Sequence, residues 1–134
     1  MIIDDAICEL KEKFSIFNET YDGDDDAYLI YGAFGMFTLD VINLYMSGCN
    51  SPQNYFYSDL KTLYKTSELR VSEVENIFSY VDKIFIEYKE EMNDILNTCI
   101  FEAWMGNDYS YNLARKYLSK ETYNHYLDIT KRVI

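Results

Sequence analysis

The stretch that decides the fold is Ala27 to Gly48, AYLIYGAFGMFTLDVINLYMSG, 22 residues in which Asp40 is the only charged side chain. A run of this length and apolarity is typical of a membrane span or of a helix buried on most sides. Thr38, Asp40 and Asn43 lie near its middle, where lipid penalises polar groups, and no Lys or Arg closely flanks either end. We therefore expect no membrane segment, but the central helix of a soluble bundle, over about residues 25–46.

Apolar residues recur at helical spacing on both sides of this run. One proline and five glycines interrupt the 134 residues, and no stretch alternates as a strand would. Helices are predicted over about residues 3–17, 25–46, 52–65, 72–88, 92–105, 110–118 and 119–131. The predicted fold class is therefore all-α: one domain, residues 1–134, with six or seven helices around the buried central helix.

Several residues are predicted to fix the helix ends and contacts. Ser72 forms a capping box with Glu75, and Ser119 caps the last helix. Asp24 or Asp25 is expected to cap the central helix. Within that helix, the glycines at 32 and 35 would let a neighbouring helix approach closely.

The net charge is strongly negative, with 12 Lys and Arg against 23 Asp and Glu, giving −11. The charge is uneven: residues 1–26 and 68–108 each carry a net −7, residues 27–67 are neutral, and residues 109–134 carry +3. Such a field repels nucleic acid and attracts basic proteins. The basic tail is expected to pair with acids of the 68–108 segment.

The densest acidic segment, Asp22-Gly23-Asp24-Asp25-Asp26, resembles the start of a calcium loop. An EF-hand loop that begins at Asp22 would need glycine at position 27 and a chelating glutamate at position 33. This sequence has Ala27 and Ala33 there. Helix capping needs one or two of the four aspartates. The surplus is either solvated or faces a partner.

The chain offers little for catalysis. His125 is the only histidine, with Glu121 and Asp128 one turn away, and nucleophile, zinc and phosphate-loop motifs are missing. The three cysteines show no paired spacing, and the acidic N-terminus does not look like a signal peptide. We therefore expect a cytoplasmic protein that is not an enzyme and needs no metal or cofactor.

Tyrosine is abundant, with 14 residues, and suits half-buried positions and interfaces. Tyr80 falls opposite the apolar stripe of its helix and is expected to be exposed among charges. The acidic and aromatic residues that we expect to contact a protein partner are Asp22, Asp24, Asp25, Asp26, Glu73, Tyr80, Glu90, Glu91, Asp94, Tyr109 and Tyr111.

Residues 74–105 carry a pattern that comprises Ile77-Phe78, Asp82, Glu90-Glu91, Asn97 and Glu102. This pattern resembles a family of small, acidic, helical bacterial immunity proteins, often encoded beside contact-dependent or polymorphic toxins. The segment ARKYLSKETYNHY, Ala114 to Tyr126, is similar to that family's closing segment, so the resemblance spans under half of the chain. It implies neutralisation of a toxin in the cytoplasm and assigns no catalytic residue.

Three functions remain as hypotheses. The first is an immunity protein that binds a basic toxin domain, most simply a nuclease, as a monomer in a 1:1 complex, because nuclease sites must attract phosphate. The second is a phage or mobile-element inhibitor that mimics nucleic acid or blocks a defence enzyme. The third is a small metal-binding or enzymatic bundle. Neighbouring genes distinguish the first two, and calorimetry with calcium, zinc and iron tests the third.

Overall fold

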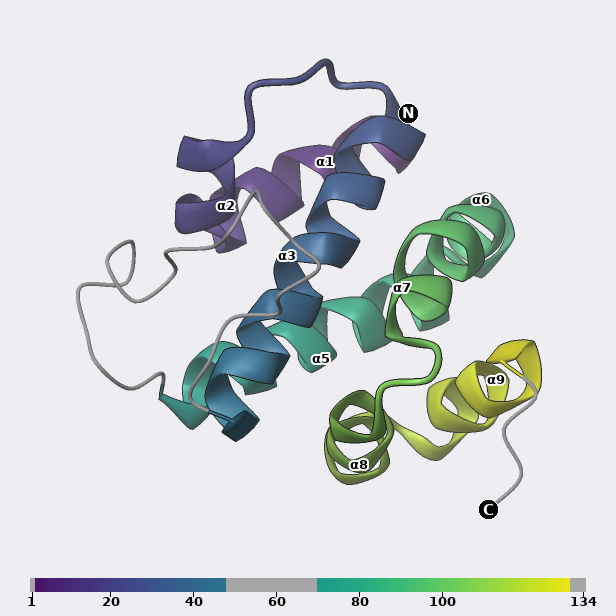
Figure 1. The fold of residues 1–134 in the computed structure, drawn as a ribbon. Coiled ribbons are helices and arrows are strands. Elements are labelled where there is room, and N and C mark those ends of the chain that lie inside the picture. Colours follow the sequence, from purple (N-terminus) through teal and green to yellow (C-terminus); the bar gives the residue numbers. More distant parts are fainter. Residues whose placement is uncertain (1, 48–69, 131–134) are drawn as a thin grey trace.

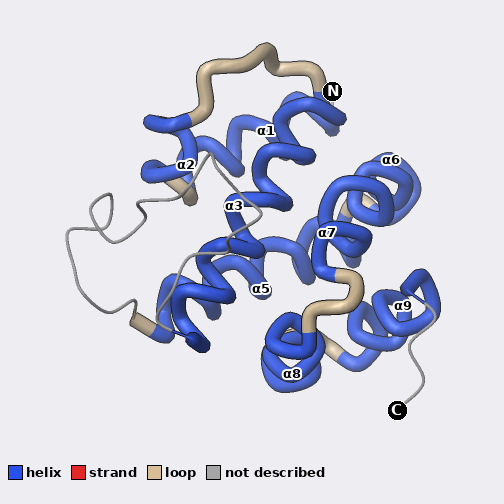
Figure 2. The backbone as a smooth tube through the Cα atoms, in the orientation of Figure 1, coloured by secondary structure: helices blue, strands red, loops and turns tan. Residues whose placement is uncertain are grey.

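The structure is a computed structural model that describes residues 2–47 and 70–130. The elements are α1 (Ile2–Lys13), α2 (Ser15–Thr20), α3 (Ala27–Ser47), α5 (Val71–Glu87), α6 (Lys89–Ile95), the π-helix η1 (Leu96–Phe101), α7 (Glu102–Trp104), α8 (Asp108–Tyr117) and α9 (Lys120–Thr130). Because α6, η1 and α7 follow one another without a gap, they form one continuous helical segment, and the described residues contain seven helical segments and no strand (Figure 2). The predicted all-α bundle is confirmed.

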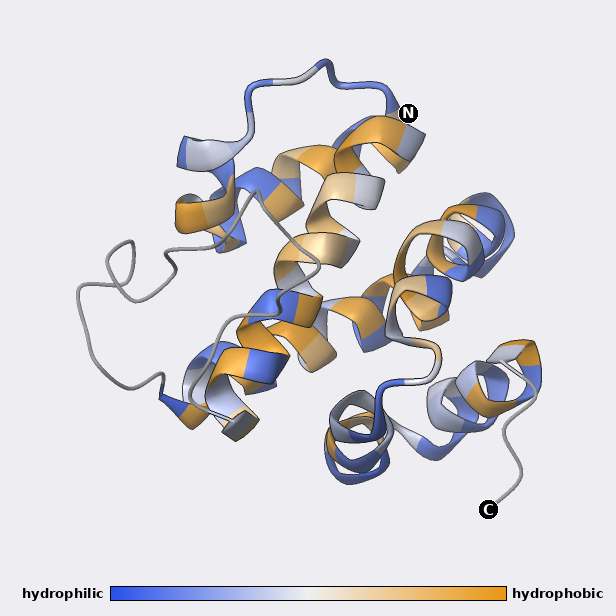
Figure 3. Cartoon of the chain, viewed as in Figure 1, coloured by the Kyte–Doolittle hydropathy of each residue, from blue (hydrophilic) through white to orange (hydrophobic). Residues whose placement is uncertain are grey.

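Helix α3 crosses the middle of the bundle, with α1 and α2 on one side (Figure 1). Helices α5, α6, η1, α7 and α8 pack against it, and α9 packs on η1, α5 and α8. Its sequence is apolar over nearly its whole length (Figure 3). By length and composition it could cross a membrane, a test that the core helix of a soluble protein also passes. Here it is the central helix of the bundle, as the sequence predicts, and 56% of its most apolar window is buried.

The polar residues inside α3 connect it to its neighbours. Thr38 is fully buried, and its hydroxyl oxygen accepts a hydrogen bond from the Trp104 indole at 2.9 Å. Near the end of the helix, Asn43 accepts a hydrogen bond from the Asn107 side chain at 2.9 Å. A buried polar group needs such a partner, so these residues favour packing against α7 and α8 over contact with lipid.

Gly35 allows η1 to lie directly against α3. A Cβ atom at Gly35 would stand 2.0 Å from the Cys99 carbonyl oxygen, which is far inside van der Waals contact. The expectation of a close helix approach is therefore confirmed at this glycine. At Gly32 an added Cβ would meet no atom of the described residues within 4 Å, so no described helix approaches closely there.

Two predicted helix starts differ from the structure. The side chain of Asp26, and not of Asp24 or Asp25, caps α3 by accepting hydrogen bonds from the backbone N–H groups of Tyr28 and Leu29. Helix α5 begins at Val71, one residue before the predicted start at Ser72. Its N-cap residue is Arg70, whose side chain makes no capping hydrogen bond, so the capping box predicted for Ser72 and Glu75 does not form the start of this helix. The helix predicted over residues 52–65 lies outside the described residues. At the last helix, the hydroxyl of Ser119 does face the backbone N–H of Thr122, as predicted.

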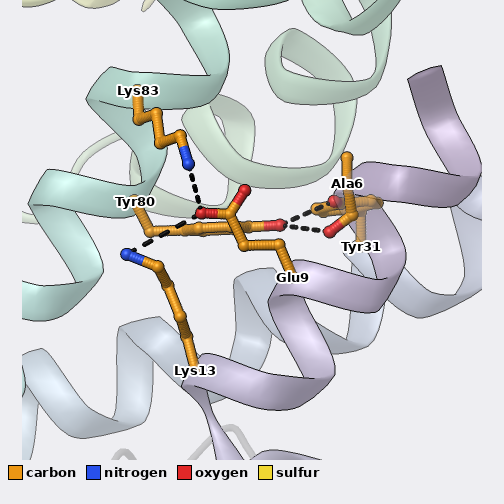
Figure 4. Close-up of polar contacts among 6 residues, drawn as sticks. All are labelled: Ala6, Glu9, Lys13, Tyr31, Tyr80 and Lys83. Carbon is orange, nitrogen blue, oxygen red and sulfur yellow. Dashed lines mark hydrogen bonds and ion pairs between the residues drawn. The ribbon is translucent and has the colours of Figure 1, made fainter.

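Tyr80 is buried, contrary to prediction (Figure 4). Its hydroxyl donates to the Ala6 carbonyl at 2.9 Å, so the Tyr31 hydroxyl, 2.8 Å away, must donate to Tyr80. Burial raises the pKa of Tyr80 and, likewise, that of Tyr31. The helical period placed Tyr80 opposite the apolar stripe of α5, but α1 and α3 cover that side as well, so tertiary packing and not amphipathicity decides its position.

Candidate partner-binding surface

The loop between α2 and α3 is organised around Tyr21. The ring stacks on Phe17, with centroids 5.5 Å apart and planes at 18°, and its hydroxyl donates to the Asp24 carbonyl. Burial raises the pKa of Tyr21, and the nearby carboxylates of Asp24, Asp25, Asp26 and Asp22 raise it further. The predicted acidic cluster is therefore a set of exposed carboxylates gathered around one positioned aromatic ring.

The four aspartates of this loop have different roles. Asp25 pairs with Lys11 at 2.7 Å, and Asp26 caps α3. Asp22 and Asp24 are exposed and form no ion pair with the described residues. Two of the four carboxylates, those of Asp25 and Asp26, therefore have a structural role. The other two form no ion pair with a described residue.

A second acidic segment meets this loop at the start of α3. Tyr28 donates its hydroxyl hydrogen to a carboxylate oxygen of Asp94, at the end of α6. This hydrogen bond, with burial and the charges of Asp94 and Asp26, raises the pKa of Tyr28. Tyr28 therefore lies between carboxylates from the two most negative parts of the sequence, residues 1–26 and 68–108.

Glu90 and Glu91 extend the same face. They precede Asp94 by four and three residues, so the three side chains are neighbours along α6, and all three are exposed. We call the whole region the acidic surface; it comprises Asp22, Asp24, Asp25, Asp26, Tyr28, Leu29, Glu90, Glu91 and Asp94.

The acidic surface contains two large apolar side chains that the sequence analysis missed. Tyr28 is 47% exposed and Leu29 is 57% exposed, although both belong to the most apolar run of the chain. In sequence they look like the rest of a buried helix. The signal that could have marked them is their position in the first turn of that helix, next to four aspartates, where the bundle no longer covers them.

Four predicted partner residues do not lie on this surface. Glu73 is in the first turn of α5, about 20 Å along that helix from the start of α6. Tyr109 is 37% exposed, but it lies in the first turn of α8, and the residue that caps this helix, Asn107, bonds to Asn43 near the far end of α3. Tyr80 is buried, as described above.

Tyr111 is also buried, contrary to prediction. It stacks on Tyr126 with ring centroids 4.7 Å apart and planes at 11°, and it is 3% exposed. The hydroxyl of Tyr126 donates to the Trp104 carbonyl at 3.0 Å, which fixes this aromatic pair in the core. The packing of α8 on α9, which a local pattern does not reveal, turns Tyr111 inward.

No group of three or more His, Cys, Asp or Glu side chains in residues 2–47 and 70–130 is arranged to hold a metal ion. His125 faces Asn97, with 2.7 Å between the ring nitrogen Nε2 and the amide oxygen, and contacts the Phe85 ring. Burial and the Lys89 charge lower the pKa of His125. Burial raises the pKa of the Cys99 thiol to about 11, which disfavours a reactive thiolate.

Two polar residues, Asp82 and Asn97, hold the C-terminal helices together. Asp82 accepts hydrogen bonds from the hydroxyl of Ser119 at 2.8 Å and from its backbone N–H at 3.3 Å, so α5 is tied to the start of α9. The pair of Asn97 and His125 ties η1 to the same helix. These side chains have structural partners and do not belong to the acidic surface.

Comparisons of the chain with protein-family models, with curated proteins and with solved structures each found no match. Functional inference therefore depends on the acidic surface and on the residues within it.

Proposed function

We propose that this protein is a cytoplasmic immunity protein that binds a basic toxin domain through the acidic surface. The toxin domain that we propose first is a nuclease, and the protein binds it as a monomer in a 1:1 complex. The observation that carries the proposal is the hydrogen bond from Tyr28 to Asp94, because it joins the two acidic segments around an exposed aromatic side chain. The family resemblance of residues 74–126 points to the same function.

Apart from Asp25, which pairs with Lys11, the carboxylates of the acidic surface form no ion pair with a described residue. Arg115, Lys116 and Lys120 of the basic tail form no ion pair with any described acid, so the predicted pairing of these three is wrong for the acids of residues 70–108. The other two bases of the tail, at 131 and 132, lie outside the described residues. Uncompensated carboxylates attract a cationic protein and raise its association rate.

The apolar residues of the acidic surface supply binding energy that charge alone does not supply. Aromatic side chains at the centre of an interface contribute much of its binding energy, whereas exposed ion pairs contribute little. Tyr28 is such a candidate, with the exposed Leu29 next to it in the chain and a hydrogen bond to Asp94. A surface of this kind favours a basic protein over a small anionic ligand or a nucleic acid.

Co-expression with the product of the adjacent open reading frame tests this function. The expected result is that the neighbour alone arrests growth, that this chain restores growth, and that the two purify as a 1:1 complex. Tyr28→Ala with Leu29→Ala should abolish rescue, and Tyr109→Ala, which removes an exposed tyrosine elsewhere, should not. A neighbour that is harmless and unbound would contradict the proposal.

A further inference from the structure

A cavity of about 350 Å³ lies beside the acidic surface, between the end of α2, the loop that follows it and one face of α3. Tyr21 and Asp22 line it on the loop side, and Gly32, Ala33 and Met36 line it on the helix. Its volume is in the range of ligand sites, and it is far larger than a single water molecule needs.

The helix side of the cavity is apolar and open. Gly32, Ala33 and Met36 are spaced as one face of α3, and this face continues that of Leu29, three residues before Gly32. An added Cβ at Gly32 would meet no atom of residues 2–47 and 70–130 within 4 Å, so the glycine contributes space here and not a close contact with a described helix. This wall suits the methylene groups of a long side chain.

The loop side is negative and aromatic. The Asp22 carboxylate is exposed and forms no ion pair among the described residues, and the carboxylate of Asp24 is close enough to influence the same tyrosine. The ring of Tyr21 is held by its stacking on Phe17 and by its hydrogen bond to the Asp24 carbonyl. A cation at this position would gain from both the carboxylate and the ring face.

We propose that this cavity binds an arginine side chain of the basic partner, with the methylene chain along Gly32, Ala33 and Met36 and the guanidinium against Asp22 and Tyr21. Arginine fits better than lysine, because its planar guanidinium pairs with a carboxylate through two hydrogen bonds and stacks on an aromatic ring. The inference rests on the proposed function in one respect, the basic character of the partner.

Titration with N-acetyl-arginine amide, followed by the backbone amide NMR signals of the protein, tests the site without the partner. The expected result is saturable shifts at Gly32 and Ala33. N-acetyl-citrulline amide, which has nearly the same shape and no charge, and N-acetyl-norleucine amide should produce much smaller shifts. Equal shifts with norleucine would show an apolar site, and no shifts with arginine would show no site; either result overturns the proposal.

Three variants sharpen the test. Gly32→Met fills the cavity and should abolish the arginine shifts, whereas Gly32→Ala makes the same helix-favouring change and should retain them. If Gly32→Met alters the spectrum of the whole protein, Asp22→Asn serves instead, since it keeps the shape and removes the charge. Asp22→Asn should weaken arginine binding and leave the citrulline response unchanged; unchanged arginine binding would contradict the assignment.

The result of the arginine titration can be distinguished from the result of the test of the proposed function. If arginine does not bind in the cavity while Tyr28→Ala with Leu29→Ala still abolishes rescue, the partner-binding role stands and the pocket assignment fails. If arginine binds and the neighbouring gene product does not, the pocket stands and the assigned partner is wrong.

Discussion

Tyr28 at the start of α3 donates a hydrogen bond to Asp94 at the end of α6, and this bond joins residues that are 66 positions apart in the sequence. It makes one surface out of two acidic segments, and it fixes the orientation of an aromatic ring that is 47% exposed. Positioned aromatic residues lose little side-chain entropy on binding, so this arrangement is already prepared for a partner.

Asp94→Asn should lower the pKa of Tyr28 toward its ordinary value of 10.0, because the carboxylate that stabilises the protonated phenol is removed. The measurement is a pH titration of tyrosine labelled with ¹³C at the ring carbon that bears the hydroxyl. Glu73→Gln, which removes a charge from α5 outside the acidic surface, is the control and should leave this pKa unchanged. An identical titration of Tyr28 in the wild type and in Asp94→Asn would contradict the contact.

Tyr80→Phe should lower the free energy of unfolding by about 1–3 kcal/mol, since it leaves the Ala6 carbonyl and the Tyr31 hydroxyl without this buried partner. Urea denaturation measures the effect. Tyr109→Phe removes the hydroxyl of an exposed tyrosine and should change stability by less than about 0.5 kcal/mol. Equal effects of the two substitutions would show that Tyr80 is exposed, as its position in the helical period predicts.

The two glycines of α3 should respond to alanine in opposite directions. Gly35→Ala forces a Cβ against the Cys99 carbonyl and should destabilise the fold by about 1–3 kcal/mol or more. Gly32→Ala adds a methyl group that meets no described atom within 4 Å, and it should stabilise the fold by about 0.5–1 kcal/mol through helix propensity. Thermal or urea denaturation measures both. A Gly35→Ala variant as stable as the wild type would mean that η1 does not pack directly on α3.

His125 should make the fold less stable at acid pH. Its pKa in the folded state is lowered below the ordinary 6.5, mainly by burial, so the unfolded chain binds the proton more readily. Stability should therefore fall as the pH drops through 6.5 and cease to change on this account below the lowered pKa. Denaturation midpoints measured across this range should lose that component in His125→Gln, and an unchanged pH profile would contradict it.

The helical fold and its centre could be predicted from sequence because the run after Asp26 is apolar on every side, and such a helix needs a bundle to cover it. The same reasoning failed for Tyr80 and Tyr111. An amphipathic period identifies the apolar face of a helix. It does not show whether other helices cover the remaining faces, as α1 covers the back of α5 and α9 covers α8. The Tyr80 hydroxyl meets the Ala6 carbonyl and the Tyr31 hydroxyl only in the assembled fold.

The candidate surface could be predicted only in part. The aspartates of the loop and Asp94 are evident as negative charges in the sequence, but their meeting depends on the contact between α3 and α6, which no local pattern encodes. Tyr28 and Leu29 were missed because an exposed apolar residue at the end of a buried helix has the same local pattern as a buried one. Glu73 was included on charge alone, and its helix carries it away from the surface.

The most direct test of the central claim, that the acidic surface binds a basic protein, is the association rate with the co-purified partner across a range of salt concentrations. For the wild type the rate should fall steeply from about 0.05 to 0.5 M NaCl. Asp24→Lys with Asp94→Lys should lower the low-salt rate by more than about tenfold and flatten the salt dependence. Glu73→Lys with Glu75→Lys changes the net charge equally, from −11 to −7, and should have a much smaller effect. An association rate that is independent of salt, or an equal loss in the two double variants, would contradict the account.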